Sequence, residues 1–70
     1  MTPSQIREQR TRLSLSQLEL SRRAQVSRFR LHTFEHGGGP PLTAEEITRI
    51  LGSLRERASQ IRQRLAEAGV

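Results

Sequence analysis

The sequence contains no cysteine, lysine, aspartate, tryptophan or tyrosine. The absence of cysteine excludes disulfides and thiolate zinc sites, and the absence of aspartate excludes a Ser-His-Asp triad. Hydrophobic residues make up only 33% of the 70 residues, and two phenylalanines supply the large aromatic side chains. This composition predicts one small domain with a thin core. Oligomerisation is one of the few remaining ways for such a chain to bury more apolar surface.

Long hydrophobic runs are also missing. No stretch of the sequence approaches the roughly 20 apolar residues of a transmembrane helix, and the N-terminus has no signal-peptide core. We therefore expect a cytoplasmic protein. We expect no enzyme activity, no cofactor, no metal and no small-molecule ligand.

Positive charge is abundant, and all 12 basic residues are arginine, which gives a net charge of +5. Residues 1–42 hold seven arginines against three glutamates, whereas residues 43–70 hold five against four. An arginine-rich codon bias explains the missing lysine, but it does not explain where the charge lies. Because the guanidinium fork suits phosphates and guanine bases, the sequence indicates a polyanionic partner.

Helix-start signals divide the chain into four helical segments. Capping boxes begin at Thr2, Ser16 and Thr43, each with Gln or Glu three residues later. They predict helices over about 3–12 and 16–24 and a long helical segment from 43 onward. Ser27 is predicted to cap a helix that ends near residue 35, before the Gly37–Pro41 run. A break of the long segment at Gly52 stays open, since glycine weakens a helix by about 1 kcal/mol.

The segment 15–34 spaces its apolar residues as two short, steeply crossed helices would. The inward positions are Leu20, Ala24, Val26, Leu31 and Phe34. The outward positions of the second helix are Arg28, Phe29, His32, Thr33 and His36. An inward Phe29 remains an alternative. A basic outward face of this kind is typical of a helix-turn-helix that reads DNA.

Over residues 4 to 54 the chain resembles the lambda-repressor-like, or Xre-type, helix-turn-helix family. The residues at the family's spacing are Ile6-Arg7, Leu15-Ser16-Gln17, Glu19-Leu20, Val26-Ser27, Leu31, Phe34-Glu35 and Pro41. The resemblance implies an all-α helix-turn-helix bundle, here with an extended C-terminal helix. The chain departs from the family at Gln9, Ser21 and Gln25. Gln25 occupies a turn position that commonly takes a left-handed backbone, which costs a non-glycine residue about 1–2 kcal/mol.

The resemblance also implies roles for individual residues. Base edges would be contacted by Arg28, Phe29, Thr33 and His32, and backbone phosphates by Gln17, Arg30, Arg7 and Ser27. Arg28 suits a guanine, and Phe29 suits a thymine methyl. The expected function is a sequence-specific DNA-binding regulator of transcription. More narrowly, we expect a homodimeric repressor that binds an inverted repeat.

The C-terminal part has a heptad pattern of apolar residues. From Leu51 the apolar positions follow at intervals of 3, 4, 3, 4 and 3. This pattern predicts a dimer interface made by Leu51, Leu54, Ala58, Ile61 and Leu65. It divides the chain into a helix-turn-helix domain over 1–54 and a dimerising helix over 55–70. Alternatively, Leu51 and Leu54 close the domain's own core.

Two other functions are compatible with the sequence. An antitoxin or adaptor would use the heptad helix to bind another protein. An enzyme would use His32-Thr33-Phe34-Glu35-His36, which has the H-x-x-E-H pattern of inverted zinc proteases. A protease of that kind also needs a distant third ligand and a substrate cleft, for which 70 residues offer little room. Glu35 equally fits a position that is usually acidic in the helix-turn-helix family.

Overall fold

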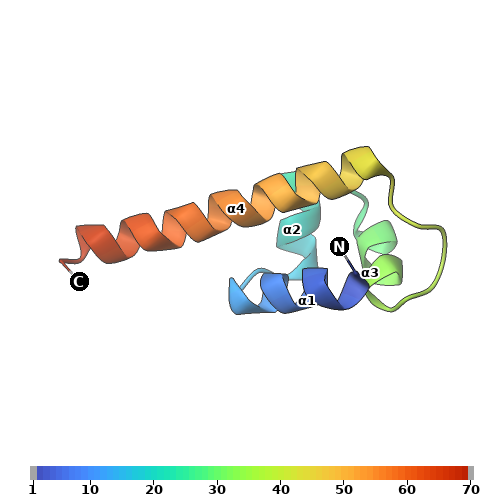
Figure 1. Ribbon diagram of the computed structural model, residues 1–70, viewed down its shortest axis with the longest axis horizontal. Coiled ribbons are helices and arrows are strands. Elements are labelled where there is room, and N and C mark those ends of the chain that lie inside the picture. The colour runs from blue at the N-terminus through green and yellow to red at the C-terminus, as the bar shows by residue number, and fades with distance from the viewer. Residues whose placement is uncertain (1, 70) are drawn as a thin grey trace.

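Four α-helices make up the fold in a computed structural model that describes residues 2–69. They are α1 (Pro3–Arg12), α2 (Gln17–Ala24), α3 (Arg28–Glu35) and α4 (Ala44–Glu67). Helix α2 packs against the N-terminal half of α4 and against α3, which in turn packs against α1, and the C-terminal half of α4 extends beyond this cluster (Figure 1). Residues 2–69 contain no strand, so the predicted all-α class is confirmed. None of the helices described is long and apolar enough to cross a membrane.

Local side-chain hydrogen bonds start three of the four helices. All three predicted capping boxes are present, at Thr2, Ser16 and Thr43. In α4, for example, the backbone N–H of Glu46 donates to Oγ1 of Thr43 at 3.1 Å. The prediction for Ser27 needs a correction. Ser27 is the N-cap residue of α3, but its hydroxyl makes no capping hydrogen bond; only its carbonyl accepts, from the N–H of Leu31.

Two non-glycine residues adopt the left-handed conformation at the ends of short helices. Gln25 ends α2 with φ 55° and ψ 42°, as its place in the turn predicts. Ser14, just after α1, has φ 57°, and nothing in the sequence analysis indicated it. The N–H of Leu15 donates to the carbonyl of Arg10 across this turn. Each of these residues is followed by a core residue, since Leu15 comes after Ser14 and Val26 after Gln25, and both are buried.

The core lies where α1, α2 and α3 meet the first half of α4. The largest fully buried side chains among residues 2–69 are those of Ile6, Leu20, Leu31 and Ile50. The remaining buried hydrophobic residues are Leu15, Ala24, Val26, Leu42 and Leu54, and Leu13, Phe34 and Ile47 pack against them half-buried. Burying a side chain of the Leu or Ile type stabilises the fold by about 1.5–3 kcal/mol. This small cluster therefore carries most of the hydrophobic stabilisation.

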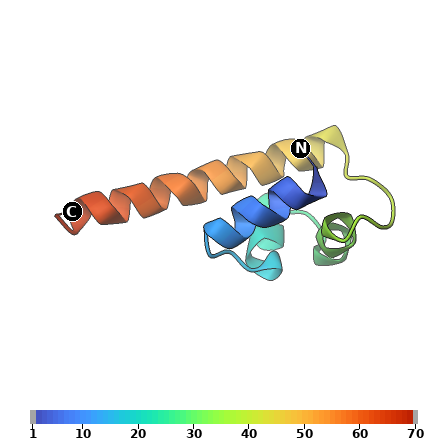
Figure 2. The ribbon, with the colours of Figure 1, turned by 60° about the horizontal axis from the view of Figure 1, so that its bottom comes forward.

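Helix α4 is continuous through Gly52, so the break left open by the sequence does not occur. The boundary predicted between residues 54 and 55 lies inside this helix and separates no two elements. The molecule is 45 Å long but only 19 by 18 Å across because the end of α4 projects from the cluster. Figure 2 shows this projection from a second direction. We refer to residues 55–67 of α4 as the tail.

Candidate nucleic-acid interface

The outer face of α3 carries exposed side chains on a helix whose inner face is fixed in the core. Leu31 is fully buried, and Val26 in the preceding turn is 5% exposed. Arg28 and His32 are exposed, and the Phe29 side chain is 75% exposed. The alternative of an inward Phe29 is therefore wrong. The structure brings Arg28, Phe29 and His32 to solvent on one short helix, as the spacing predicts.

Gln17, at the start of α2, belongs to a hydrogen-bond network with α1 and α3. Its Nε2 donates to Oε1 of Glu35 at 3.3 Å, and its Oε1 lies 3.3 Å from Nδ1 of His32. The carboxylate of Glu35 is in turn held by the guanidinium of Arg10 at 2.8 and 2.9 Å. The side chain of Gln17, the predicted phosphate-binding residue, is half-buried. Contacts at both its amide nitrogen and its amide oxygen fix its orientation. Gln17 is linked directly to a predicted base-contacting residue.

Thr33 is less available than its predicted role requires. Its hydroxyl donates to the carbonyl of Phe29 at 2.7 Å, one turn earlier in α3. Its methyl group lies against Gly39, where any added Cβ atom would overlap it. Gly39 also has φ +73°, a conformation that favours glycine. Thr33 therefore packs against the loop between α3 and α4 instead of presenting its side chain freely.

Arg30 forms an ion pair with Glu46 that joins α3 to the start of α4. Nε of Arg30 donates to Oε2 of Glu46 at 2.9 Å, and the Glu46 side chain also accepts from the N–H of Thr43. The hydrogen bond from Arg30, followed by the bond with the Thr43 backbone, lowers the pKa of Glu46 from its ordinary 4.5 to about 2. The charge of Arg30 is thus largely neutralised within the protein, so its predicted phosphate contact would have to compete with Glu46.

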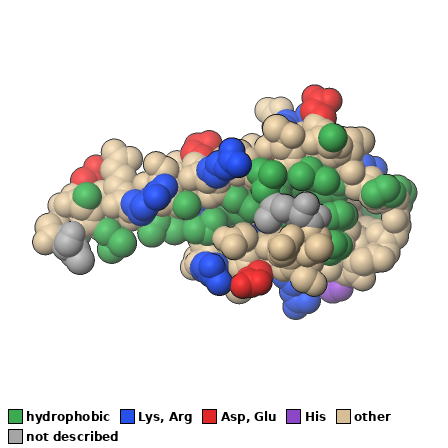
Figure 3. All heavy atoms as spheres, in the orientation of Figure 1, with side chains coloured by type: hydrophobic (Ala, Val, Ile, Leu, Met, Phe, Trp, Pro, Cys, Tyr) green, Lys and Arg blue, Asp and Glu red, His purple; other side chains and the backbone are tan. Residues whose placement is uncertain are grey.

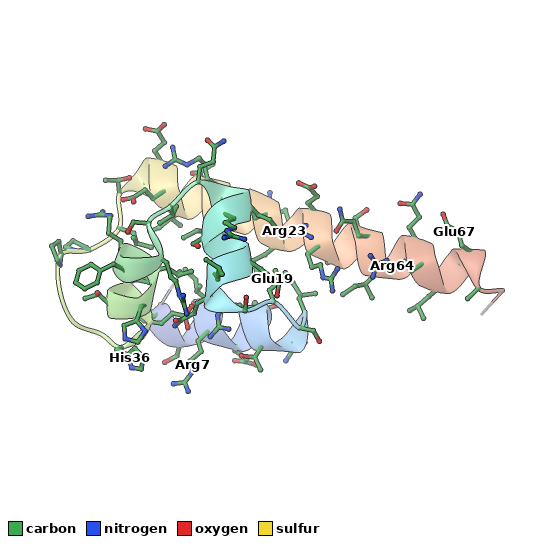
Figure 4. All side chains as sticks on the ribbon, turned by 180° about the vertical axis from the view of Figure 1, so that it is seen from behind. Arg7, Glu19, Arg23, His36, Arg64 and Glu67 are labelled. Atoms are coloured by element: carbon green, nitrogen blue, oxygen red, sulfur yellow. The ribbon has the colours of Figure 1, made fainter. Side chains whose placement is uncertain are left out.

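Ser27 and Arg7 flank α3 from two other parts of the chain, and both are exposed. Because the Ser27 hydroxyl makes no capping bond, it remains free to bind an external acceptor. Arg7 projects from α1 toward the same side of the molecule as His36 at the end of α3 (Figure 4). Of the four predicted phosphate-contacting residues, Ser27 and Arg7 are exposed, whereas the side chains of Gln17 and Arg30 are hydrogen-bonded to glutamates of the protein.

The H-x-x-E-H residues do not come together as a metal site. The rings of His32 and His36 are stacked obliquely, with centroids 4.3 Å apart. The side chain of Glu35 is 1% exposed and bound to Arg10 on the inner side of α3. Residues 2–69 contain no group of three or more His, Cys, Asp or Glu side chains that could hold a metal ion. Glu35 holds helices together here and is not free to activate water.

The five residues of the predicted dimer interface have different environments. Leu54 is 6% exposed and belongs to the protein's own core, so its assignment to an intermolecular interface is wrong. Leu51, Ala58 and Ile61 are half-buried, and Leu65 is 52% exposed. The apolar pattern of α4 therefore has two parts. Its first half closes the domain, as the alternative interpretation held, and its second half faces solvent.

Sequence reasoning missed Arg10 and Glu46 as the residues that position the interface. Arg10 was indistinguishable from the neighbouring surface arginines, because its partner lies 25 residues away. Glu46 was identified only as a capping residue. A comparison of the chain with family models, with curated proteins and with solved structures finds no match. The side chains of the candidate interface therefore provide the evidence about function.

Proposed function

We propose that the protein is a sequence-specific DNA-binding regulator of transcription that inserts α3 into the major groove. The observation that carries the proposal is the exposure of Phe29. Among residues 2–69, Phe29 and Leu65 are the large hydrophobic residues left exposed. In a chain with so thin a core, a solvent-facing aromatic ring beside the exposed Arg28 favours a surface that is covered on binding.

The chemistry of the neighbouring side chains supports DNA as the partner. Arg28 begins α3, where residues of a recognition helix contact base edges. Its guanidinium can bind O6 and N7 of a guanine, and the adjacent Phe29 can pack on a thymine methyl. His32 extends the same face by one turn. We assign base readout to these three residues and leave Thr33 in a packing role.

Docking on the DNA phosphate backbone would depend on Gln17, Ser27 and Arg7. Gln17 is held by Glu35 and has few alternative orientations, so little entropy would be lost when it binds a phosphate. Ser27, at the start of α3, and Arg7, on α1, are both exposed. Such contacts fix orientation without reading sequence. Arg30 would contribute less, because Glu46 already binds its guanidinium.

We further propose that the protein represses transcription by occupying its site. The homodimer on an inverted repeat stays a prediction, and the symmetry of the selected site tests it. A preferred site with two inverted half-sites would support a dimer on DNA. A single short site would support a monomer.

The experiment is selection of double-stranded DNA fragments by the purified protein, followed by gel-shift titration of the preferred site. Arg28→Ala should weaken binding by about 1–3 kcal/mol and relax one base position. Arg12→Ala is the matched control, because Arg12 is an exposed arginine on α1 that pairs with Glu8. No enriched sequence, or equal effects of the two substitutions, would contradict the proposal.

A further inference from the structure

The tail of α4 presents an apolar stripe that the rest of residues 2–69 covers only in part. Leu65 is 52% exposed, Ile61 and Ala58 are half-buried, and Ala68 beyond the helix is exposed. Figure 3 shows hydrophobic side chains along one edge of the tail, continuous with those of the cluster. We call these four residues, Ala58, Ile61, Leu65 and Ala68, the tail stripe.

A shallow groove joins the tail stripe to the body of the protein. It has a volume of about 240 Å³ and is lined by Gln9, Leu13, Leu51, Leu54, Arg55 and Ala58. Gln9 comes from α1 and Leu13 directly follows that helix, so the groove lies between the end of α1 and the middle of α4. An apolar side chain from a partner helix would fit this groove, and the rest of that helix would then follow the tail stripe.

Arginine occupies every e and g position of the tail. With Leu51 and Leu54 at heptad positions a and d, positions e are Arg55 and Arg62 and positions g are Arg57 and Arg64. Glu56 and Glu67 fall at f and c, away from the stripe. Arg57 donates to the carbonyl of Leu13 at 3.2 Å. Arg55, Arg62 and Arg64 are exposed, and none of them is among the ion pairs of residues 2–69.

This arrangement of charge opposes pairing of two identical tails. Residues at e and g decide which helices associate in a coiled coil. Two antiparallel copies would set Arg55 beside Arg62 and Arg57 beside Arg64. Two parallel copies would set Arg57 beside Arg62. Either orientation brings only positive charges together, because the glutamates of the tail face away.

We propose that the tail stripe docks an amphipathic helix of another protein that carries apolar residues flanked by glutamate or aspartate. Acidic residues at the flanks would pair with Arg55, Arg62 and Arg64. The stripe is one residue wide at each turn, which matches a coiled-coil seam. Membrane-surface helices carry wider apolar faces with aromatic residues, and the tail has none. This proposal goes beyond DNA binding and does not depend on it.

The test uses the intact chain and two synthetic helical peptides of about three heptads, with leucine at a and d. One peptide has glutamate at e and g, and its control has lysine there. The chain should bind the glutamate peptide and bind the lysine peptide at least about tenfold more weakly, a difference of 1.4 kcal/mol. Equal binding of the two peptides, or binding of neither, would overturn the proposal.

Two variants connect this binding to the stripe. Ile61→Asp with Leu65→Asp should abolish binding of the glutamate peptide, and circular dichroism should show that the helices are kept. Arg62→Glu with Arg64→Glu should abolish it too. This second variant should also make the chain dimerise, because Arg55 and Arg57 of one copy would then face glutamates in the other.

Sedimentation equilibrium in the absence of DNA measures this gain of dimerisation, with the wild-type chain expected to be monomeric at the same concentration. A wild-type dimer that dissociates in the Ile61→Asp, Leu65→Asp variant would assign the stripe to a second copy and overturn the proposal. Tighter binding to phosphatidylserine vesicles than to the glutamate peptide would overturn it in favour of a lipid surface. Peptide binding that survives the arginine reversals unchanged would also overturn it.

Discussion

Arg10 and Glu35 form a bidentate ion pair that joins α1 to the end of α3. Nε and Nη2 of Arg10 donate to the two carboxylate oxygens at 2.9 and 2.8 Å, and the side chains are 14% and 1% exposed. The third nitrogen of Arg10 donates to the carbonyl of Leu15. Gln17 shares one oxygen of Glu35. The pair therefore sets how α2 and α3 lie relative to α1 and, with them, the proposed DNA-binding face.

Removing one partner of this pair should destabilise the fold strongly. Arg10→Ala leaves the Glu35 carboxylate buried without its cation, a situation that costs about 3–5 kcal/mol. Replacing both residues with apolar ones, Arg10→Met with Glu35→Leu, should recover most of that loss, because no buried charge remains. Urea unfolding followed by circular dichroism measures both changes. If the double variant is as unstable as Arg10→Ala, the pair does more than neutralise a buried charge.

Gln25→Gly should stabilise the protein by about 1 kcal/mol. Gln25 is held at φ 55°, which strains an L-residue with a Cβ atom but not glycine. Gln25→Ala is the control, since it removes the same side chain and keeps the strain. The thermal unfolding midpoint of Gln25→Gly should therefore lie above that of Gln25→Ala. A destabilising effect of Gln25→Gly would show that the strain at this turn is small.

The Arg30–Glu46 pair should make stability depend on acid pH. The pKa of Glu46 is lowered in the fold from 4.5 to about 2, first by the Arg30 hydrogen bond. A depressed carboxylate pKa stabilises the fold above the unfolded pKa, and this contribution is lost as the pH falls through the folded pKa. The stability difference between wild type and Glu46→Gln should therefore be largest above pH 4.5 and shrink toward pH 2.

Urea midpoints measured for both proteins across this range test that expectation. The other glutamates titrate in both proteins, so their effects cancel in the difference. A difference that is constant with pH would contradict a charged Glu46 as the source of the stabilisation. Any difference that remains at pH 2 would report the fraction of Glu46 that is still ionised, because the pKa of Glu46 in the fold lies near that pH.

DNA binding, if it occurs as proposed, should be strongly sensitive to salt. Each phosphate contact contributes about −0.9 to the slope of log K against log salt concentration. Arg7→Ala should weaken binding to all sequences alike and reduce that slope by about 1. Arg30→Ala should change the slope less, because Glu46 already neutralises Arg30. Fluorescence anisotropy between about 50 and 200 mM salt separates the two variants. Equal slopes for wild type and Arg7→Ala would remove Arg7 from the interface.

Features that depend on a few neighbouring residues could be predicted from the sequence. The capping boxes at Thr2, Ser16 and Thr43 need only residues i and i+3, and all three are present. The buried positions Leu20 and Leu31 follow from spacing within one or two helical turns. The all-α class followed from the same local signals. The left-handed turn at Gln25 was implied by the resemblance to the helix-turn-helix family and not by spacing.

Features that depend on how helices cross were decided by the tertiary structure. The ion pairs Arg10–Glu35 and Arg30–Glu46 span 25 and 16 residues, and no local rule links those positions. The same packing buried Leu54 and left Leu65 exposed, although both lie on one regular heptad pattern. The periodicity of apolar residues along a helix predicts which residues share a face. Only the point where the neighbouring helices end decides how much of that face is covered. Here α1 ends beside the middle of α4 (Figure 1), whereas α2 ends at Ala24, whose carbonyl accepts from Arg49 in the first part of α4.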